Sequence, residues 1–185
     1  GGDGNLYTGD TQWHSDGYGT RPVLSIKIAF YLDPVEHHTG ALRVIPGSHR
    51  IHDHFADCLD RHFQHGKTAF GLSQNQIPSV TLESTPGDVL VFNHNIKHSS
   101  FGGSQKRRMY TMNFSQRYPD DKLQDLRENL GKEARFWIDR IHGDLMINTA
   151  GPDRMVHLRQ VRENDAHLRD LTQELKKTME EPARG

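Results

Sequence analysis

Up to about residue 118, apolar residues recur at every second position in short runs bounded by Gly and Pro. This pattern limits the possible folds of the chain more than any other feature of the sequence. Residues 23–32 (VLSIKIAFYL) alternate throughout, which predicts a strand with one apolar face. Further short strands are expected within residues 40–49, 80–83, 89–92 and 107–114, with a polar, His-rich loop and a short helix within 50–75. Many short strands separated by turns predict a mostly β fold, either a sandwich or a barrel.

Beyond Tyr118-Pro119 the apolar residues recur every three or four positions, which is typical of helices. One apolar stripe is formed by Leu123, Leu126, Leu130, Ala134, Trp137 and Ile141. A second, thinner stripe lies within residues 156–179, whose other faces are charged. We therefore expect a β core at 1–118 and a helical extension at 119–185, which either packs on the core or forms a homodimer or partner contact.

Charge and composition exclude several classes of protein. Lys and Arg number 23 against 24 Asp and Glu, so no nucleic-acid-binding face is set by bulk charge. No apolar run approaches the roughly 18 residues that cross a bilayer, and no signal peptide is visible. A single cysteine, Cys58, excludes an internal disulfide framework and a thiolate zinc cluster. We expect no nucleic-acid or membrane partner and a cytoplasmic location, where a reducing environment suits a lone thiol.

Thirteen histidines in 185 residues raise the question of a metal site. On a strand, His-x-Asp places both side chains on one face, where they can converge on one ion. The motif alone carries little weight, because chance gives about one match in a chain of this composition. Two matches occur, His14/Asp16 and His142/Asp144. The second pair follows a helical stretch and no strands come after it, so we interpret it as a surface pair.

His14 and Asp16 instead open the run of strands. A Pro-Gly-Asp turn and an apolar strand, typical of a buried position, precede His94 and His98, and Arg107 begins the last strand. One carboxylate and two imidazoles form the face that non-haem Fe(II) enzymes use, and an Arg fork matches a carboxylate. This order fits a jelly-roll barrel whose mouth holds iron and whose Arg binds the far carboxylate of 2-oxoglutarate.

Five ordered segments carry a family likeness: residues 11–16 (TQWHSD), 39–49 (TGALRVIPGSH), 87–92 (GDVLVF), 98–100 (HSS) and 107–114 (RRMYTMNF). Together they resemble the phytanoyl-CoA dioxygenase-like Fe(II)/2-oxoglutarate oxygenases, a superfamily that includes ectoine hydroxylases. The likeness spans about residues 8–118. It implies a double-stranded β-helix, the jelly-roll or cupin-like barrel, followed here by amphipathic C-terminal helices.

The resemblance implies that His14, Asp16 and His98 are the iron ligands. His94 is the competing distal ligand, but the family places that histidine directly before a pair of small residues, and such a pair follows His98. A carboxylate at position 16 favours hydroxylation over halogenation, because related halogenases have a small residue there that leaves room for chloride.

The same resemblance implies that Arg107 pairs with the C5 carboxylate of 2-oxoglutarate and that Ser100 helps to hold it. Arg108 is the competing arginine. By strand alternation Gln12 shares the face of the His-x-Asp motif, so we expect it to line the pocket. Lys27 either faces the interior, toward an anionic substrate or cosubstrate, or faces solvent.

We predict no metal-binding role for the other histidines. The Gly-Ser-His segment that ends at His49 is expected to be a turn that closes a strand. Solvated loop positions are expected for His37, His38, His52, His54, His62 and His65.

The sequence therefore predicts an enzyme that uses Fe(II), 2-oxoglutarate and O2 to hydroxylate a C–H bond of a small-molecule substrate, with release of succinate and CO2. Two alternatives stay open: a non-catalytic jelly-roll module that binds a ligand or partner, and a cupin-type metalloenzyme that does not use 2-oxoglutarate. Family members usually carry a helical portion and another strand before the motif. Only 13 residues precede His14, so we expect both to be absent.

Overall fold

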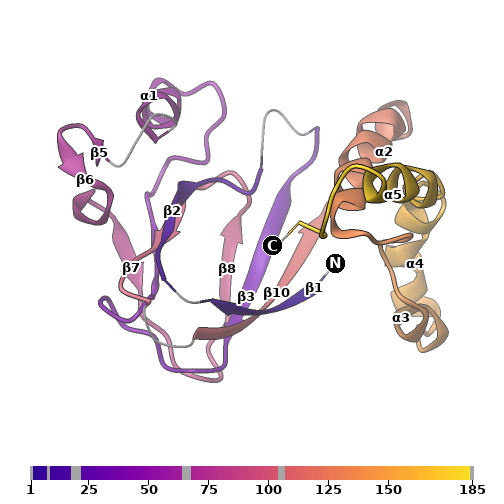
Figure 1. Ribbon diagram of the computed structural model, residues 1–185, viewed down its shortest axis with the longest axis horizontal. Coiled ribbons are helices and arrows are strands. Elements are labelled where there is room, and N and C mark those ends of the chain that lie inside the picture. The colour runs from indigo at the N-terminus through magenta and orange to yellow at the C-terminus, as the bar shows by residue number, and fades with distance from the viewer. Residues whose placement is uncertain (1, 8, 18–21, 64–67, 104–106, 184–185) are drawn as a thin grey trace. The chain divides into compact units, whose positions relative to one another are not determined.

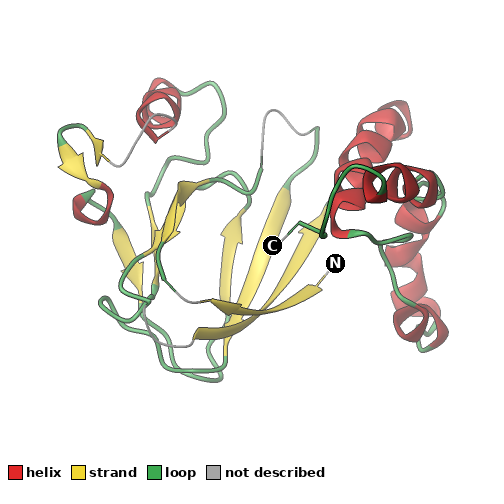
Figure 2. Ribbon diagram, in the orientation of Figure 1, coloured by secondary structure: helices red, strands yellow, loops and turns green. Residues whose placement is uncertain are grey.

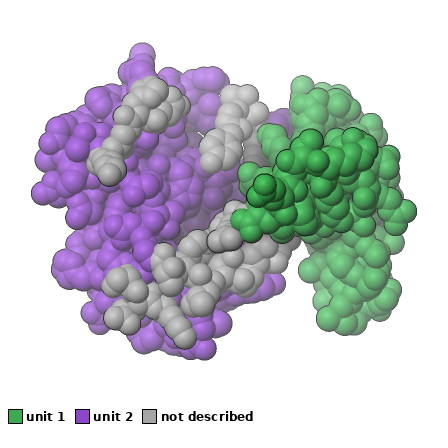
Figure 3. All heavy atoms as spheres, viewed as in Figure 1, with its two compact units in different colours: residues 1, 116–185 green, residues 2–115 purple. Residues whose placement is uncertain are grey.

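The computed structural model describes residues 2–7, 9–17, 22–63, 68–103 and 107–183. Contacts within the chain divide it into a β unit, residues 2–115, and a helical unit that begins at Gln116 (Figure 3). Within the described ranges, no helix combines the length and the apolar character needed to cross a membrane.

The β unit contains two four-stranded antiparallel sheets (Figures 1 and 2). The first sheet has the order β1 (Gly2–Tyr7), β10 (Arg107–Ser115), β3 (Ser25–Tyr31) and β8 (Leu90–Asn93). The second has the order β2 (Thr11–His14), β9 (His98–Ser100), β4 (Leu42–Val44) and β7 (Val80–Leu82). The short strands expected from the turn pattern are thus confirmed, and together they make a mostly β fold.

The two sheets share one hydrophobic core. It is built from Ala29, Tyr31, Val35, Ala41, Leu42, Val44 and Phe92. Most of them come from β3 and β8 of the first sheet and from β4 of the second, while Val35 and Ala41 lie in the connection between β3 and β4, so the core joins the two sheets. β4 is buried along its whole length, whereas β3 buries chiefly one of its faces.

The expectation of one apolar face on the strand at 23–32 is confirmed only in part. The buried face of β3 is the mixed one, where Ser25, Ala29 and Tyr31 are almost inaccessible. The flanking residues of the more apolar face, Leu24 and Leu32, are half-exposed. Small side chains such as that of Ala29 fit between the sheets, so the face of β3 that carries them is buried although it is the less hydrophobic face. Hydrophobicity alone would assign the other, more apolar face to the interior.

The expected absence of a strand before the His-x-Asp motif is wrong. Residues 2–7 form β1, which pairs antiparallel with β10 from Gly2 opposite Met112 to Tyr7 opposite Arg107. The segment GDGNLY lacks the β-branched residues and the alternation that predict a strand. Its pairing depends on the free edge that β10 offers.

The segment between β4 and β7 packs against the second sheet. It contains α1 (His54–Phe63), the hairpin of β5 (Thr68–Ala69) and β6 (Leu72–Ser73), and a 3-10 helix (Gln74–Gln76). The sequence predicted the short helix but not the hairpin, whose strands have two residues each. A second core cluster holds the segment in place and consists of Trp13, Ile45, Leu59, Ala69, Ile77 and Phe101. Trp13 of β2 stacks on Phe63 of α1 with ring centroids 5.7 Å apart.

The helical unit is more broken than the apolar stripes predicted. Its helices are α2 (Leu123–Gly131), α3 (Asp144–Asn148), α4 (Pro152–Arg162) and α5 (Leu168–Lys176), with 3-10 turns at Asp120–Lys122 and Lys132–Phe136. The first stripe ends at Trp137, whose φ of 57° is left-handed and stops the helix. The second is interrupted between Arg162 and Leu168, where Asn164 and Asp165 are buried.

Candidate active site

Three side chains converge where β2 and β9 lie side by side. His14 ends β2, Asp16 follows it in a bend, and His98 opens β9 directly opposite His14. Their ligand atoms all lie within 4.8 Å of one another. Nε2 of His14 is 3.8 Å from Oδ1 of Asp16, and Nε2 of His98 is 3.5 Å from Oδ2. This is the only such group of His, Cys, Asp or Glu among the residues that the structure describes.

Both imidazoles are oriented by backbone carbonyls. Nδ1 of His14 lies 2.7 Å from the Gln12 carbonyl oxygen, and Nδ1 of His98 lies 3.0 Å from that of Ile96. A carbonyl can only accept, so each Nδ1 carries a proton, and in the neutral imidazole Nε2 then keeps its lone pair. Both lone pairs therefore belong to the nitrogens nearest Asp16, as in histidines that bind a metal.

Burial and charge set the protonation of this cluster. Burial disfavours the imidazolium and lowers the pKa of His98 to about 4, despite the opposing attraction of Asp16. Burial alone would raise the pKa of Asp16, but attraction to His98, Lys27 and His14 holds it below its ordinary value. His98 is uncharged near pH 7, and Lys27 stabilises the Asp16 carboxylate at that pH. The cluster thus offers an ionised carboxylate and a neutral His98, the forms that bind metals.

Lys27 faces the interior, which resolves the alternative left by the sequence. It lies on β3 opposite Phe92 of β8, and its Nζ is 2.9 Å from Oδ2 of Asp16. Gln12 does not follow the expectation that it lines a pocket. Its side chain is exposed, and only its backbone carbonyl touches the cluster, through His14. The irregular pairing of β2 with β9 between Thr11 and His14 is a departure from the strict alternation on which that expectation relied.

Arg107 and Arg108 point to opposite sides of β10. Arg107 is 3% exposed and its Nη1 donates to the Gly40 carbonyl oxygen and to Oγ of Ser100. Arg108 is exposed and pairs with Asp33, its Nη2 lying 2.7 Å from Oδ1. The interior arginine is therefore Arg107, the one that the family resemblance favoured.

Gly40 is required beside Arg107. Its φ of +99° is a left-handed conformation, and a Cβ there would come within 3.0 Å of the Arg107 Nη1. Oγ of Ser100 donates to the Gly40 carbonyl oxygen at 2.7 Å, so Ser100, Gly40 and Arg107 form one buried polar group. Sequence reasoning missed Gly40, although it lies within one of the family segments.

The competing histidines lie elsewhere. His94 is buried and its Nε2 is 3.0 Å from Oδ1 of Asn113, outside the cluster. In the second His-x-Asp motif, His142 is buried while Asp144 is exposed and pairs with Arg140, so the two do not converge.

Of the other histidines, His52 and His54 are exposed, and so are His37, His38 and His62. His37 is nevertheless bonded, since its Nε2 is 3.2 Å from Nη2 of Arg43. His49 lies in the expected turn after β4. His65 falls outside the described residues.

The donor set fits Fe(II). Two imidazole nitrogens and one carboxylate on one side of an ion leave the remaining positions open, which is the ligand pattern of non-haem Fe(II) oxygenases. His14, Asp16 and His98 thus match the ligand set that these enzymes use for Fe(II).

Comparison with solved structures gives several similar proteins. EvdMO1 is 23% identical over 62% of this chain and 26% of its own, with a TM-score of 0.45. EvdO2 from Micromonospora carbonacea var. aurantiaca, complexed with 2-oxoglutarate, is 24% identical over 63% of this chain and 51% of its own, also with a TM-score of 0.45. EctD from S. alaskensis, with 2-oxoglutarate and 5-hydroxyectoine, is 23% identical over 60% of this chain and 42% of its own, with a TM-score of 0.41. The chain thus spans a quarter to a half of the length of these proteins.

Comparison with curated proteins gives no match. The family model for phytanoyl-CoA dioxygenase (PhyH) matches residues 5–110, which is more than half of the chain and runs from β1 into β10. The matched range contains the His14, Asp16 and His98 cluster and the buried Arg107. By this match, the chain belongs to the phytanoyl-CoA dioxygenase family.

Proposed function

We propose that this protein is an Fe(II)- and 2-oxoglutarate-dependent oxygenase that hydroxylates an unactivated C–H bond of a small molecule. The observation that carries the proposal is the convergence of His14, Asp16 and His98, with both imidazoles held by backbone carbonyls so that Nε2 is the free nitrogen. We assign these three residues as the iron ligands. The strand orders of the two sheets support the double-stranded β-helix expected for such an enzyme.

Each residue has a distinct task in this proposal. Arg107, fixed by Gly40 and Ser100, receives the C5 carboxylate of 2-oxoglutarate, because a buried guanidinium binds an anion strongly. Lys27 compensates negative charge beside Asp16. Bound Fe(II) supplies the oxidative chemistry, in which O2, 2-oxoglutarate and the substrate C–H become succinate, CO2 and a C–OH group. The protein contributes positioning and a carboxylate at position 16, which favours hydroxylation.

Replacement of the aspartate in each His-x-Asp motif tests the proposal. The wild-type chain with Fe(II) and 2-oxoglutarate under anaerobic conditions is expected to show a weak visible charge-transfer band and, in air, to form succinate from 2-oxoglutarate. Asp16→Ala should lose both signals. Asp144→Ala, the matched control at the exposed aspartate of the second motif, should keep both.

The outcomes separate the alternatives. A non-catalytic module would give neither the band nor succinate in the wild type. A cupin-type metalloenzyme would bind the metal but would be indifferent to 2-oxoglutarate and to replacement of Arg107. For the helical unit, packing on the core and homodimer formation stay open predictions, and the mass of the protein in solution distinguishes them.

A further inference from the structure

Two buried polar side chains lie behind the ligand cluster. Ser15 separates His14 from Asp16, and Lys97 directly precedes His98; they are 6% and 7% exposed. Successive residues of an extended chain point to opposite sides, so both side chains lie on the side away from the ligand atoms. They meet there, because Nζ of Lys97 donates to Oγ of Ser15 at 2.8 Å.

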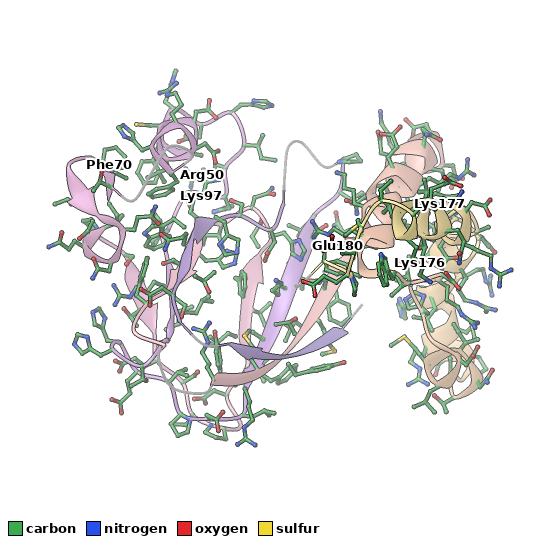
Figure 4. The ribbon with its side chains drawn as sticks, in the orientation of Figure 1. Arg50, Phe70, Lys97, Lys176, Lys177 and Glu180 are labelled. Carbon is green, nitrogen blue, oxygen red and sulfur yellow. The ribbon has the colours of Figure 1, made fainter. Side chains whose placement is uncertain are left out.

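The Lys97 side chain joins three segments. Besides Ser15, its Nζ forms an ion pair with Oδ1 of Asp60 in α1. Oγ of Ser15 in turn donates to the Asn95 carbonyl oxygen at 2.8 Å, in the loop that leads into β9. Figure 4 shows Lys97 between α1 and β2. One ammonium group thus connects the His14/Asp16 segment, the approach to His98 and the helix.

The Lys97 backbone is fixed as well. Its N–H donates to Oγ of Ser48 at 2.8 Å, and its carbonyl oxygen accepts from the Ile45 N–H at 3.0 Å. Oγ of Ser48 donates to the Ile45 carbonyl oxygen at 2.6 Å. The Pro-Gly-Ser turn after β4 therefore holds the residue next to His98 in place, and the freedom left to the Lys97 side chain is small.

Fold stability alone gives little reason for a lysine at this position. A buried ammonium must be paired, and its desolvation offsets much of what the pair gains, so apolar residues of similar size often serve a fold as well. Asp60, the counterion, is half-exposed. What an apolar side chain could not supply is the directed hydrogen bond to Ser15.

We infer that Lys97 is a positioning residue of the metal centre, which fastens the His14/Asp16 segment to the strand that carries His98. This inference rests on the proposed iron site. Outer-shell partners of metal ligands typically contribute 10–100-fold to metal affinity. Without the Lys97–Ser15 bond, the bend that carries Asp16 keeps only its links to the loop before β9, where Ser15 donates to the Asn95 carbonyl oxygen and the Gly17 N–H to the His94 carbonyl oxygen. The position of Asp16 relative to His98 is then less tightly fixed.

Metal affinity of the metal-stripped full chain tests the inference, with Co(II) as the probe and urea unfolding as the measure of stability. Lys97→Met and Ser15→Ala are each expected to weaken Co(II) binding about 10–100-fold. The double variant should lose less affinity than the two single losses combined, because both changes remove the Lys97–Ser15 bond. Each single change also removes one further partner, Asp60 from Lys97 or the Asn95 carbonyl oxygen from Ser15. Lys177→Met is the matched control; it breaks an exposed ion pair with Glu174 in the helical unit and should stay within about twofold of wild type (Figure 4).

Co(II) affinities of Lys97→Met and Ser15→Ala equal to the wild type would overturn the inference, and so would additive losses in the double variant. Should Lys97→Met fail to fold, Ser15→Ala decides, since it removes one hydroxyl only. A wild-type chain that binds no Co(II) would contradict the proposed iron site itself. If the wild type binds Co(II) tightly and both variants bind it equally well, only the role of Lys97 is contradicted.

Discussion

Replacing Arg107 with Met removes the guanidinium that we assign to the C5 carboxylate of 2-oxoglutarate. A guanidinium can donate two hydrogen bonds to one carboxylate, and hydrogen bonds to charged groups contribute about 1.5–3 kcal/mol each. Loss of both, taken at the lower value, is about 3 kcal/mol, which corresponds to about a 100-fold rise in the Kd of 2-oxoglutarate.

The fold should survive this change. Arg107 is buried, and Met fills a similar space without a charge. Ser100 donates to the Gly40 carbonyl oxygen at 2.7 Å, so neither group is left without a partner when the arginine is removed. The loss should therefore appear in 2-oxoglutarate binding, with metal affinity unchanged.

The assay is anaerobic calorimetry of 2-oxoglutarate binding to the Fe(II)-loaded chain, with urea unfolding in parallel. Arg108→Met is the matched control, because Arg108 is the next residue of β10 but lies on the exposed face against Asp33. It should bind 2-oxoglutarate as the wild type does. If Arg107→Met binds within threefold of wild type, or if Arg108→Met loses affinity instead, the assignment of the carboxylate site is wrong.

Two further predictions concern the ligand cluster. The pKa of His98 falls from its ordinary 6.5 to about 4 in the folded chain, so between these pH values the folded state binds fewer protons than the unfolded state. The free energy of unfolding of the metal-free protein therefore has its full value above pH 6.5 and declines toward pH 4 by at most about 3 kcal/mol. Urea unfolding at several pH values, compared with His98→Asn, measures this decline, and equal pH slopes for the two proteins would contradict it. The Lys27 ammonium, 2.9 Å from Oδ2 of Asp16, competes with a metal ion for this carboxylate, so Lys27→Met should tighten Co(II) binding severalfold in the absence of 2-oxoglutarate. Weaker Co(II) binding in this variant would show that Lys27 supports the metal instead.

The strands could be predicted because their information is local, and so could the closeness of His14 to Asp16. Alternation and Pro-Gly turns mark the strands, and a spacing of two residues keeps His14, the last residue of β2, near Asp16 in the bend that follows. The choice of His98 over His94 needed the family resemblance. In the structure it has a simple cause, since β9 pairs His98 with His14 while His94 lies in the preceding turn against Asn113.

What could not be predicted depends on distant contacts. The break between α4 and α5 has no Gly or Pro; there Asp165 accepts from the Ile141 N–H at 3.0 Å, and Oδ1 of Asn164 accepts from Nε of Arg127 at 2.9 Å. The Lys97–Ser15 bond joins residues 82 positions apart. Contacts between residues so far apart leave no periodicity or motif in a short stretch of sequence, so they could not be predicted from it.

The identity of the iron ligands is the central claim, and X-ray absorption of the anaerobic Fe(II)-loaded chain tests it most directly. The account predicts scattering from two imidazoles in the wild type and in His94→Ala. It predicts one imidazole in each of His14→Ala and His98→Ala. Two imidazoles retained in His98→Ala, or one lost in His94→Ala, would contradict it.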